Sequence, residues 1–189
     1  DRLALLVHDM QRYFCRVYPE GAPLAPVIGN IARLIHAARA AGVPVFYTAQ
    51  KGNQFRPDRG LQADLWGPGM SATPEHEEIL RVGLGDRRHR AGQASLQRLP
   101  ALQPGAADAR ARPRPADDLR RLCHIGCLAT AVEAFQRDIE AFAVADAQAD
   151  FSREKQDMAM EWIAATCGVP LSTRQALEAL GTHGVKSCA

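Results

Sequence analysis

An unbroken apolar run near the start of the chain, Leu3 to Val7, leads directly into the ionisable pair His8 and Asp9. A short, continuous apolar run of this kind is typical of a strand buried on both faces, as in a parallel sheet. In open α/β sheets, ligands bind at the carboxyl ends of such strands. Asp9 is therefore predicted where chemistry would take place. A carboxylate at this position can equally well cap the following turn, so both interpretations of Asp9 stay open here.

The residues that follow predict a β-α-β unit. Apolar side chains recur at helical spacing after Pro26, and Gly42 is suited to the position just beyond the helix. These side chains are Val27, Ile28, Ile31, Leu34, Ile35 and Ala38. Val43–Thr48 is then predicted as a second buried strand, so we expect a crossover connection and a parallel pair. A long connection through Arg59 and Trp66 follows, and loops of that length are usually functional.

The second half of the chain also alternates predicted helices and strands. A short helix is expected near 74–80, with Thr73 as its cap. One helical face after His124 is marked by Leu128, Val132, Phe135 and Ile139. A strand over 142–146 ends in Asp146, and Asp150 and Ser152 are candidate caps of a helix over 153–166. The inner side of that helix is predicted to carry Met158, Trp162 and Ala165. A last strand over 169–172 and a helix from Thr173 to about Leu180 complete the domain, and 181–189 is a tail.

Composition limits the class of protein. At 189 residues, of which 47% are hydrophobic, the chain is long enough for one folded domain with a core. A formal net charge of +2 gives no reason to expect a nucleic acid or a membrane surface as a partner. No stretch has the apolar length of a membrane span, and no secretory signal opens the chain, so a cytoplasmic protein is expected.

The five cysteines are best interpreted as free thiols. Cys123 and Cys127 are spaced like a pair of metal ligands, but no second pair at zinc spacing follows. No metal site is therefore predicted.

Residues 83–123 differ sharply from the rest. This segment contains no Val, Ile, Thr, Phe, Tyr, Trp or Lys and is dominated by Arg, Ala, Gly, Gln, Leu and Pro. Interior strands of a parallel sheet need β-branched or aromatic residues, which are absent here. Taken at face value, the segment has the composition of a basic linker of low complexity.

Six short motifs outside this segment occur in a fixed order. They are His8-Asp9-Met10-Gln11, Tyr47-Thr48-Ala49-Gln50, Asp58-Arg59-Gly60, Trp66-Gly67-Pro68-Gly69, His124-Ile125-Gly126-Cys127, and Val144-Ala145-Asp146-Ala147 with Ala149-Asp150-Phe151-Ser152. Together they resemble the isochorismatases of catecholate siderophore synthesis, in the isochorismatase-like hydrolase superfamily. The resemblance covers about residues 1–82 and 124–180.

This resemblance implies a doubly wound α/β domain over 1–180, with a mostly parallel six-stranded sheet and helices on both faces. It also implies hydrolysis of the vinyl ether of isochorismate to 2,3-dihydro-2,3-dihydroxybenzoate and pyruvate. Such a reaction needs protonation of the terminal carbon and addition of water, with no enzyme nucleophile, metal or cofactor. A carboxylic acid kept protonated by an apolar setting can supply the proton.

The residue roles are carried over by position. Asp9 matches the family's acid, and Gln50 and Arg59 match positions that hold the substrate, where Arg59 would clamp a carboxylate. Phe14 and Trp66 would wall the ring pocket, although plain core packing explains these two almost as well. Relatives often form oligomers, so a homo-oligomer is expected without an identified interface. Some siderophore enzymes also carry a C-terminal carrier domain, and this chain, which ends at Ala189, is expected to have none.

Gly126 discriminates between branches of the superfamily. The amidase branch has a nucleophilic Cys at this place, whereas the ether hydrolases have Gly. Cys127 lies one residue further on, and a helical step of about 100° is expected to turn it away from the site. Ether hydrolases of phenazine synthesis act on the 2-amino analogue of isochorismate. The run His124–Leu128 looks closer to the siderophore group, but the choice between the two substrates stays open.

The chain departs from the family between its third and fifth expected strands. The family has a catalytic-site Lys there, followed closely by Arg-Tyr-Ser-Ala-Phe, but no Lys occurs between Lys51 and Lys155.

Our hypothesis is that 83–123 is translated in a shifted reading frame. Reading one base later permits Lys in place of Gln93 and Tyr-Ser-Ala-Phe-Gln in place of Leu96–Pro100. An insertion or a degenerate, inactive protein is the alternative, and a single clean frame in resequenced DNA would exclude the frame shift. If the printed chain is the real molecule, we expect an aggregation-prone protein with little activity.

Overall fold

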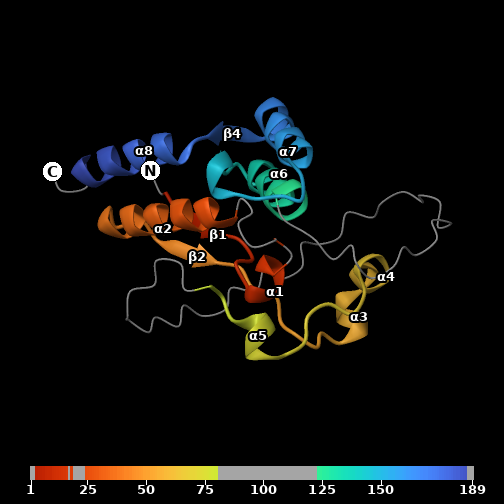
Figure 1. The fold of residues 1–189 in the computed structure, drawn as a ribbon. Coiled ribbons are helices and arrows are strands. Elements are labelled where there is room, and N and C mark those ends of the chain that lie inside the picture. Colours follow the sequence, from red (N-terminus) through yellow and green to blue (C-terminus); the bar gives the residue numbers. More distant parts are fainter. Residues whose placement is uncertain (1–2, 17, 19–23, 81–122, 187–189) are drawn as a thin grey trace.

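The computed structural model describes residues 3–16, 18, 24–80 and 123–186 (Figure 1). The strands are β1 (Leu5–Val7), β2 (Val45–Tyr47), β3 (Ala141–Val144) and β4 (Gly168–Leu171). The longer helices are α2 (Leu24–Ala40), α6 (Leu128–Gln136), α7 (Arg153–Thr166) and α8 (Thr173–Lys186). The short helical segments are α1 (Arg12–Cys15), α3 (Arg56–Arg59), α4 (Leu61–Trp66), α5 (Pro74–Glu77), the π-helical η2 (Cys123–Cys127) and the 3₁₀-helical η3 (Ala145–Ala147). The succession of strands and helices confirms the α/β class.

The N-terminal β-α-β unit forms as predicted. β1 and β2 pair in parallel, with Leu5 opposite Val45 and Val7 opposite Tyr47. Helix α2 buries the predicted face, and Ile35 and Ala38 are fully inaccessible to solvent. The helix ends in a Schellman motif, because Gly42 has a φ of 71° and the Val43 N–H donates to the Ala38 carbonyl at 2.8 Å.

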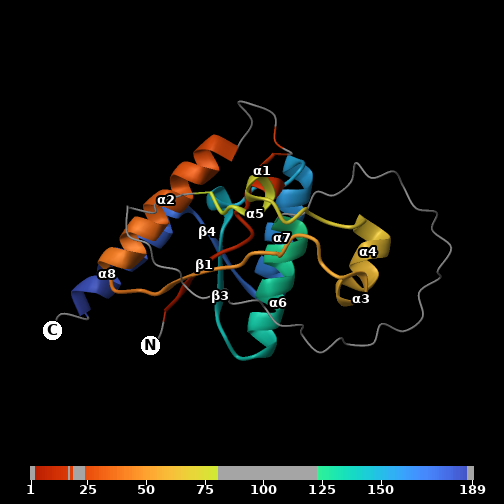
Figure 2. The same cartoon turned by 90° about the horizontal axis from the view of Figure 1, so that it is seen from below.

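The C-terminal unit pairs β3 with β4, also in parallel. Ser152 caps α7 as predicted, since its Oγ accepts from the Lys155 N–H at 3.3 Å. The acid at the end of the β3 segment is structural, because Asp146 Oδ1 accepts from the backbone N–H and hydroxyl of Thr173 at the start of α8. Helix α8 packs Leu180 against Leu34 and Ala38 of α2, and the two helices lie side by side in Figures 1 and 2.

The predicted face of α7 was wrong, and that of α6 was right only in part, because Leu128 and Val132 pack against the core. Helix α7 buries Ala159 and Ile163, whereas Met158 and Trp162 are exposed. In α6 the buried residue is Ala131, while Phe135 and Ile139 are exposed, the latter beyond the helix end at Gln136. Small residues let these helices lie close to β3 and β4, so neighbouring positions with larger side chains are turned outward.

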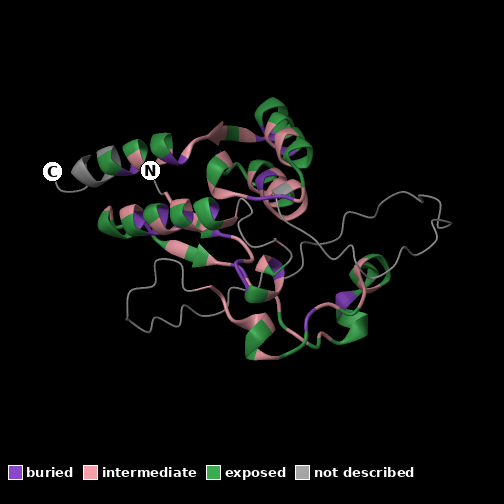
Figure 3. Ribbon diagram, viewed as in Figure 1, coloured by how far each residue is buried: buried purple, intermediate pink, exposed green. Residues whose placement is uncertain are grey.

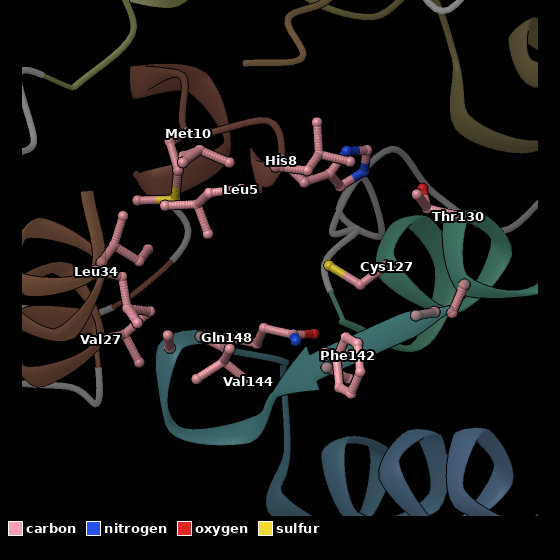
Figure 4. A pocket seen from close by; sticks show the side chains of 18 of the residues that line it. Leu5, His8, Met10, Val27, Leu34, Cys127, Thr130, Phe142, Val144 and Gln148 are labelled. Atoms are coloured by element: carbon pink, nitrogen blue, oxygen red, sulfur yellow. The ribbon is translucent and has the colours of Figure 1, made fainter. Parts of the chain in front are cut away.

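The described strands form two pairs and not the expected six-stranded sheet. A cavity of about 370 Å³ lies between the pairs and is lined by successive residues of both β1 and β3 (Figure 4). Successive side chains of a strand point to opposite faces of the sheet. A cavity that contacts each residue of a strand in turn therefore runs along the edge of that strand and not over one of its faces. The composition of 83–123 predicted that interior strands are missing there; all of this segment except Cys123 lies outside the described residues.

The prediction of strands buried on both faces was also wrong within the described residues. The cross-strand pair Leu6 and Phe46 is 42% and 49% exposed, and the pair Phe142 and Val169 is 51% and 54% exposed. Figure 3 shows exposed residues on strands whose other positions are partly buried. Each strand pair therefore has one covered face and one face that the described elements leave open. Among the described residues, no helix is long and apolar enough to cross a membrane.

Candidate functional site

Asp9 lies at the carboxyl end of β1 in a left-handed backbone conformation, with a φ of 46°. Asp and Asn adopt this conformation more readily than most residues, and such outliers concentrate at functional sites. The Asp9 N–H donates to Thr48 Oγ1 at 2.9 Å, and the Thr48 N–H donates to the Val7 carbonyl at 3.1 Å. The ends of β1 and β2 are therefore tied together at the position predicted for the acid.

The Asp9 carboxylate is surrounded by polar groups. Its Oδ1 lies 2.8 Å from Thr48 Oγ1, and its Oδ2 accepts from Gln50 Nε2 at 3.3 Å. His8 Nε2 is 3.8 Å from the same Oδ2, and the Asp9 side chain is 13% exposed. The expected apolar setting is therefore absent among the described residues. These donors would instead stabilise the carboxylate left after a proton has been transferred.

Thr48 couples His8 to Asp9. Its Oγ1 lies 2.7 Å from His8 Nδ1 and 2.8 Å from Asp9 Oδ1, but a hydroxyl has one hydrogen to donate. When Thr48 donates to the Asp9 carboxylate, His8 Nδ1 must carry a hydrogen and donate to Thr48. Neither Thr48 nor His8 was among the site residues predicted from the sequence, although both follow directly on the strands that position Asp9.

Gln11 holds the surrounding loops together and is 1% exposed. Its side chain accepts from the Gln50 N–H at 2.7 Å and donates to the Gln50 carbonyl at 2.9 Å. It also donates to the Glu77 carbonyl at 3.1 Å and lies 3.7 Å from Met70 Sδ. Gln11 thus fixes the backbone of Gln50, whose side chain contacts Asp9.

Gly126 reaches this cluster from η2 and faces the His8 ring. A Cβ at this position would collide with His8 Nε2 and lie 2.8 Å from His8 Cδ2. The segment is anchored by Asp150, which accepts from the His124 N–H and its ring Nδ1, both at 2.7 Å. Asp150 therefore anchors η2 and does not cap α7, the role considered for it from the sequence. Asp9 and Gly126 thus both lie against His8, and Gln50 joins the cluster through Asp9.

Arg59 packs against the 67–70 loop. Its Nε donates to the Gly67 carbonyl at 2.7 Å, and its guanidinium lies over Gly69, where a Cβ would be 2.7 Å from Nη1. Gly69 has a φ of 85°, so both its backbone and this contact favour glycine. Burial lowers the pKa of the Arg59 guanidinium, and the nearby Tyr13 hydroxyl opposes this effect.

The two predicted aromatic walls differ in their surroundings. Phe14 is buried in α1 and packs edge-on against Tyr13, with ring centroids 5.3 Å apart. Tyr13 in turn contacts the His76 ring at 5.0 Å. Trp66 is half-buried at the end of α4, which lies well away from β1 in Figures 1 and 2. Phe14 is thus packed beside the site, and Trp66 is not brought to Asp9.

The cavity between β1 and β3 adjoins the Asp9 cluster at His8. Its lining is mostly apolar and includes His8 and Cys127, whose sulfur points into the space in Figure 4. Asp9, Gln50 and Arg59 are not among its lining residues. Among the described residues that line this cavity, none is Arg or Lys. In the described part of the chain, no group of three or more His, Cys, Asp or Glu could hold a metal ion.

Cys15 is expected to be an unreactive thiol, because burial raises its pKa from 9.0 to about 11. A folded-state pKa above the unfolded one contributes stability below pH 9 that is lost as the pH rises toward 11. Iodoacetamide should therefore label Cys15 slowly at pH 8 in the folded protein and rapidly in urea. The free energy of unfolding should fall less between pH 8 and 11 in Cys15→Ala than in the parent chain; an equal fall would contradict the assignment.

Comparison with known proteins gives concordant matches. The isochorismatase domain family matches residues 3–109 and 122–175, ranges that include the first part of the 83–123 segment. The phenazine biosynthesis protein PhzD of Pseudomonas fluorescens is 42% identical over 187 residues, covering 92% of this chain and 84% of the relative. The isochorismatase of Bacillus subtilis is 39% identical over 192 residues, covering 95% and 58%. Enterobactin synthase component B of Escherichia coli is 37% identical over 185 residues, covering 95% and 64%. The chain thus spans less than two thirds of these last two relatives.

Solved structures show the same fold at low identity. A cysteine hydrolase from Pseudomonas syringae pv. phaseolicola superposes with a TM-score of 0.69 at 18% identity, covering 96% of this chain and 93% of the other. A putative isochorismatase from Burkholderia xenovorans gives a TM-score of 0.61 at 16% identity, covering 95% and 88%. At such identities the likeness concerns the fold alone.

Proposed function

Because the chain belongs to the isochorismatase family of hydrolases, we propose that it cleaves the vinyl ether of isochorismate to 2,3-dihydro-2,3-dihydroxybenzoate and pyruvate. The observation that supports this proposal is the Asp9 cluster, in which a carboxyl group at the end of β1 is hydrogen-bonded to Thr48 and Gln50. Gly126 supplies no nucleophile on the facing segment. The cluster therefore offers an acid, and position 126 adds no nucleophilic side chain to it.

In the proposed mechanism Asp9 begins as the carboxylic acid. It transfers its proton to the terminal carbon of the vinyl ether, and the π electrons form the new C–H bond, leaving an oxocarbenium ion. Water adds to that ion, and Asp9 takes back the proton which this water releases. The resulting hemiketal collapses to pyruvate and the diol, so the acid is regenerated with no net uptake of protons. Thr48 and Gln50 stabilise the intermediate carboxylate by hydrogen bonding.

Arg59 is the proposed carboxylate clamp. Its Nε is already committed to the Gly67 carbonyl, and Gln54 Oε1 accepts from its Nη1 at 3.1 Å. These bonds fix the plane of the guanidinium, which would present other N–H groups to a substrate carboxylate. Gln50 and Phe14 are proposed to contact the substrate beside Asp9.

The 2-amino analogue of isochorismate is the second candidate substrate. A relative named for phenazine biosynthesis is 42% identical to this chain, close to the 39% of the Bacillus isochorismatase. Both substrates have the same vinyl ether, so the Asp9 chemistry applies to either. They differ at the ring substituent, where an ammonium replaces a hydroxyl.

A coupled assay of pyruvate release with both substrates tests the proposal. We expect release from at least one of them, at a low rate because the chain has no Lys between Lys51 and Lys155. Absence of release from both would favour the third interpretation, a non-catalytic protein that retains the fold. Hydrolysis of an amide substrate that is blocked by thiol alkylation would instead favour an amidase.

Replacing Arg59 with Lys should raise KM for the substrate about ten- to hundredfold, because one charge-assisted hydrogen bond contributes roughly 1.5–3 kcal/mol. Lys retains the charge but cannot hold the planar geometry. Arg56→Lys is the matched control, since Arg56 lies on the same short helix and its side chain is 82% exposed. Steady-state kinetics should show the KM effect at Arg59 alone, and an equal effect at both positions would argue against the clamp.

A further inference from the structure

His8 is a titratable side chain in the site that the proposed mechanism leaves without a role. Its ring is held from one side by Thr48, 2.7 Å from Nδ1. The opposite ring nitrogen, Nε2, points toward both Asp9 Oδ2, at 3.8 Å, and the Gly126 backbone. The side chain is 20% exposed. The ring is therefore fixed between the acid and the segment that carries Gly126.

The backbone of Gly126 does not itself require glycine. The described glycines with positive φ are Gly42, Gly60, Gly67 and Gly69, and Gly126 is not one of them. Gly126 lies within η2, one residue before Cys127, and its carbonyl accepts from the Thr130 hydroxyl at 2.8 Å, as in a helix. Alanine would be preferred over glycine in such a backbone. The obstacle to any side chain at position 126 is the His8 ring.

We propose that His8 is a specificity-determining residue, whose ring fills the space that a nucleophilic side chain at position 126 would need. A thiol at that position would lie beside the Asp9 carboxylate, because its Cβ would fall within contact distance of His8 Nε2. His8 thereby commits the site to acid catalysis without a covalent intermediate. This inference rests on the proposed function for its chemical meaning, but the steric coupling can be tested independently of any activity.

His8→Asn is the appropriate partner variant. Asn retains a polar group near the position of Nδ1, where it can bond Thr48, and removes the outer ring atoms that face Gly126. The test is a double-mutant cycle of Gly126→Ala and His8→Asn, read as the folding equilibrium constant from urea denaturation. Gly29→Ala is the matched control, because Gly29 also lies in a helix and a Cβ added there would have no other atom within 4 Å.

We expect the effect of Gly126→Ala on the folding equilibrium constant to change sign between the two backgrounds. In the parent chain Gly126→Ala should lower the folding equilibrium constant about ten- to hundredfold, as overpacking of a fixed neighbour does. In the His8→Asn background the same change should raise it about two- to fivefold, because alanine restricts the unfolded chain. Gly29→Ala should raise it similarly in both backgrounds. Equal effects of Gly126→Ala in the two backgrounds would overturn the proposal.

Solubility and chemistry provide a second measurement. If Gly126→Ala alone is insoluble, recovery of soluble protein by adding His8→Asn supports the coupling, and insolubility of both contradicts it.

Gly126→Cys combined with His8→Asn should give a burst of p-nitrophenolate from p-nitrophenyl acetate, as the thiolate attacks the carbonyl and forms a thioester. A burst of the same size without His8→Asn would contradict the proposal. Failure of the parent chain to release pyruvate would refute only the proposed function, since the stability cycle does not depend on turnover.

Discussion

Replacing Asp9 with Asn is expected to lower kcat for pyruvate release about 10²- to 10⁴-fold, the contribution typical of a positioned general acid. The amide cannot give up a proton to the vinyl carbon. Asn is chosen because it tolerates the left-handed backbone of residue 9, where φ is 46°. It also retains a carbonyl oxygen that can accept from Thr48 Oγ1. The coupled pyruvate assay measures the loss, with circular dichroism as the check on folding.

Two further variants sharpen this prediction. Asp9→Ala should be less stable than Asp9→Asn, because alanine is disfavoured by about 1–2 kcal/mol in this conformation. Asp157→Asn is the neutral control, since the Asp157 side chain on α7 is 49% exposed and pairs with Arg153. A kcat of Asp9→Asn within twofold of the parent value would remove Asp9 from the role of acid, whatever the stability of the variant.

Replacing Asp150 with Ala is expected to lower the free energy of unfolding by roughly 3–5 kcal/mol, because several buried donors lose a shared acceptor and each such loss costs about 1–3 kcal/mol. The Asp150 side chain is fully inaccessible. It accepts from the backbone N–H groups of His124 and Phe151 at 2.7 and 2.8 Å and from the His124 ring. Alanine leaves these donors without their acceptor, a large loss against a typical domain stability of about 5–15 kcal/mol.

Asp150→Asn and Ser152→Ala separate the anchoring role from helix capping. Asn keeps one acceptor oxygen, so its loss should be intermediate. Ser152 is the observed cap of α7, and Ser152→Ala should lower the free energy of unfolding by about 1 kcal/mol. Urea denaturation provides the measurement for all three variants. A smaller loss in Asp150→Ala than in Ser152→Ala would show that Asp150 does not anchor η2.

Much of the N-terminal half could be predicted from the sequence because its signals are local. The apolar spacing of α2, the glycine after it and the two apolar strands each depend on residues close together in the chain, and they occur where predicted. The position of Asp9 at the end of β1 follows from the same local pattern. The predicted inner face of α7 was wrong, and that of α6 was right only at Leu128 and Val132. The side that a helix buries is decided by its neighbours, and the small residues Ala131 and Ala159 permit the closest packing.

The sequence by itself determined the α/β class, the family, and the placement of an acid after the first strand. The tertiary structure alone decided which groups surround that acid: Thr48 from the end of β2, and Gly126 from a segment more than 100 residues away. It also assigned Asp150 to the anchoring of η2 and brought the His8 ring against Gly126. The physical reason is that hydrogen bonds and steric exclusion act over a few ångströms in space, and distant segments reach that range only when the strands and helices pack.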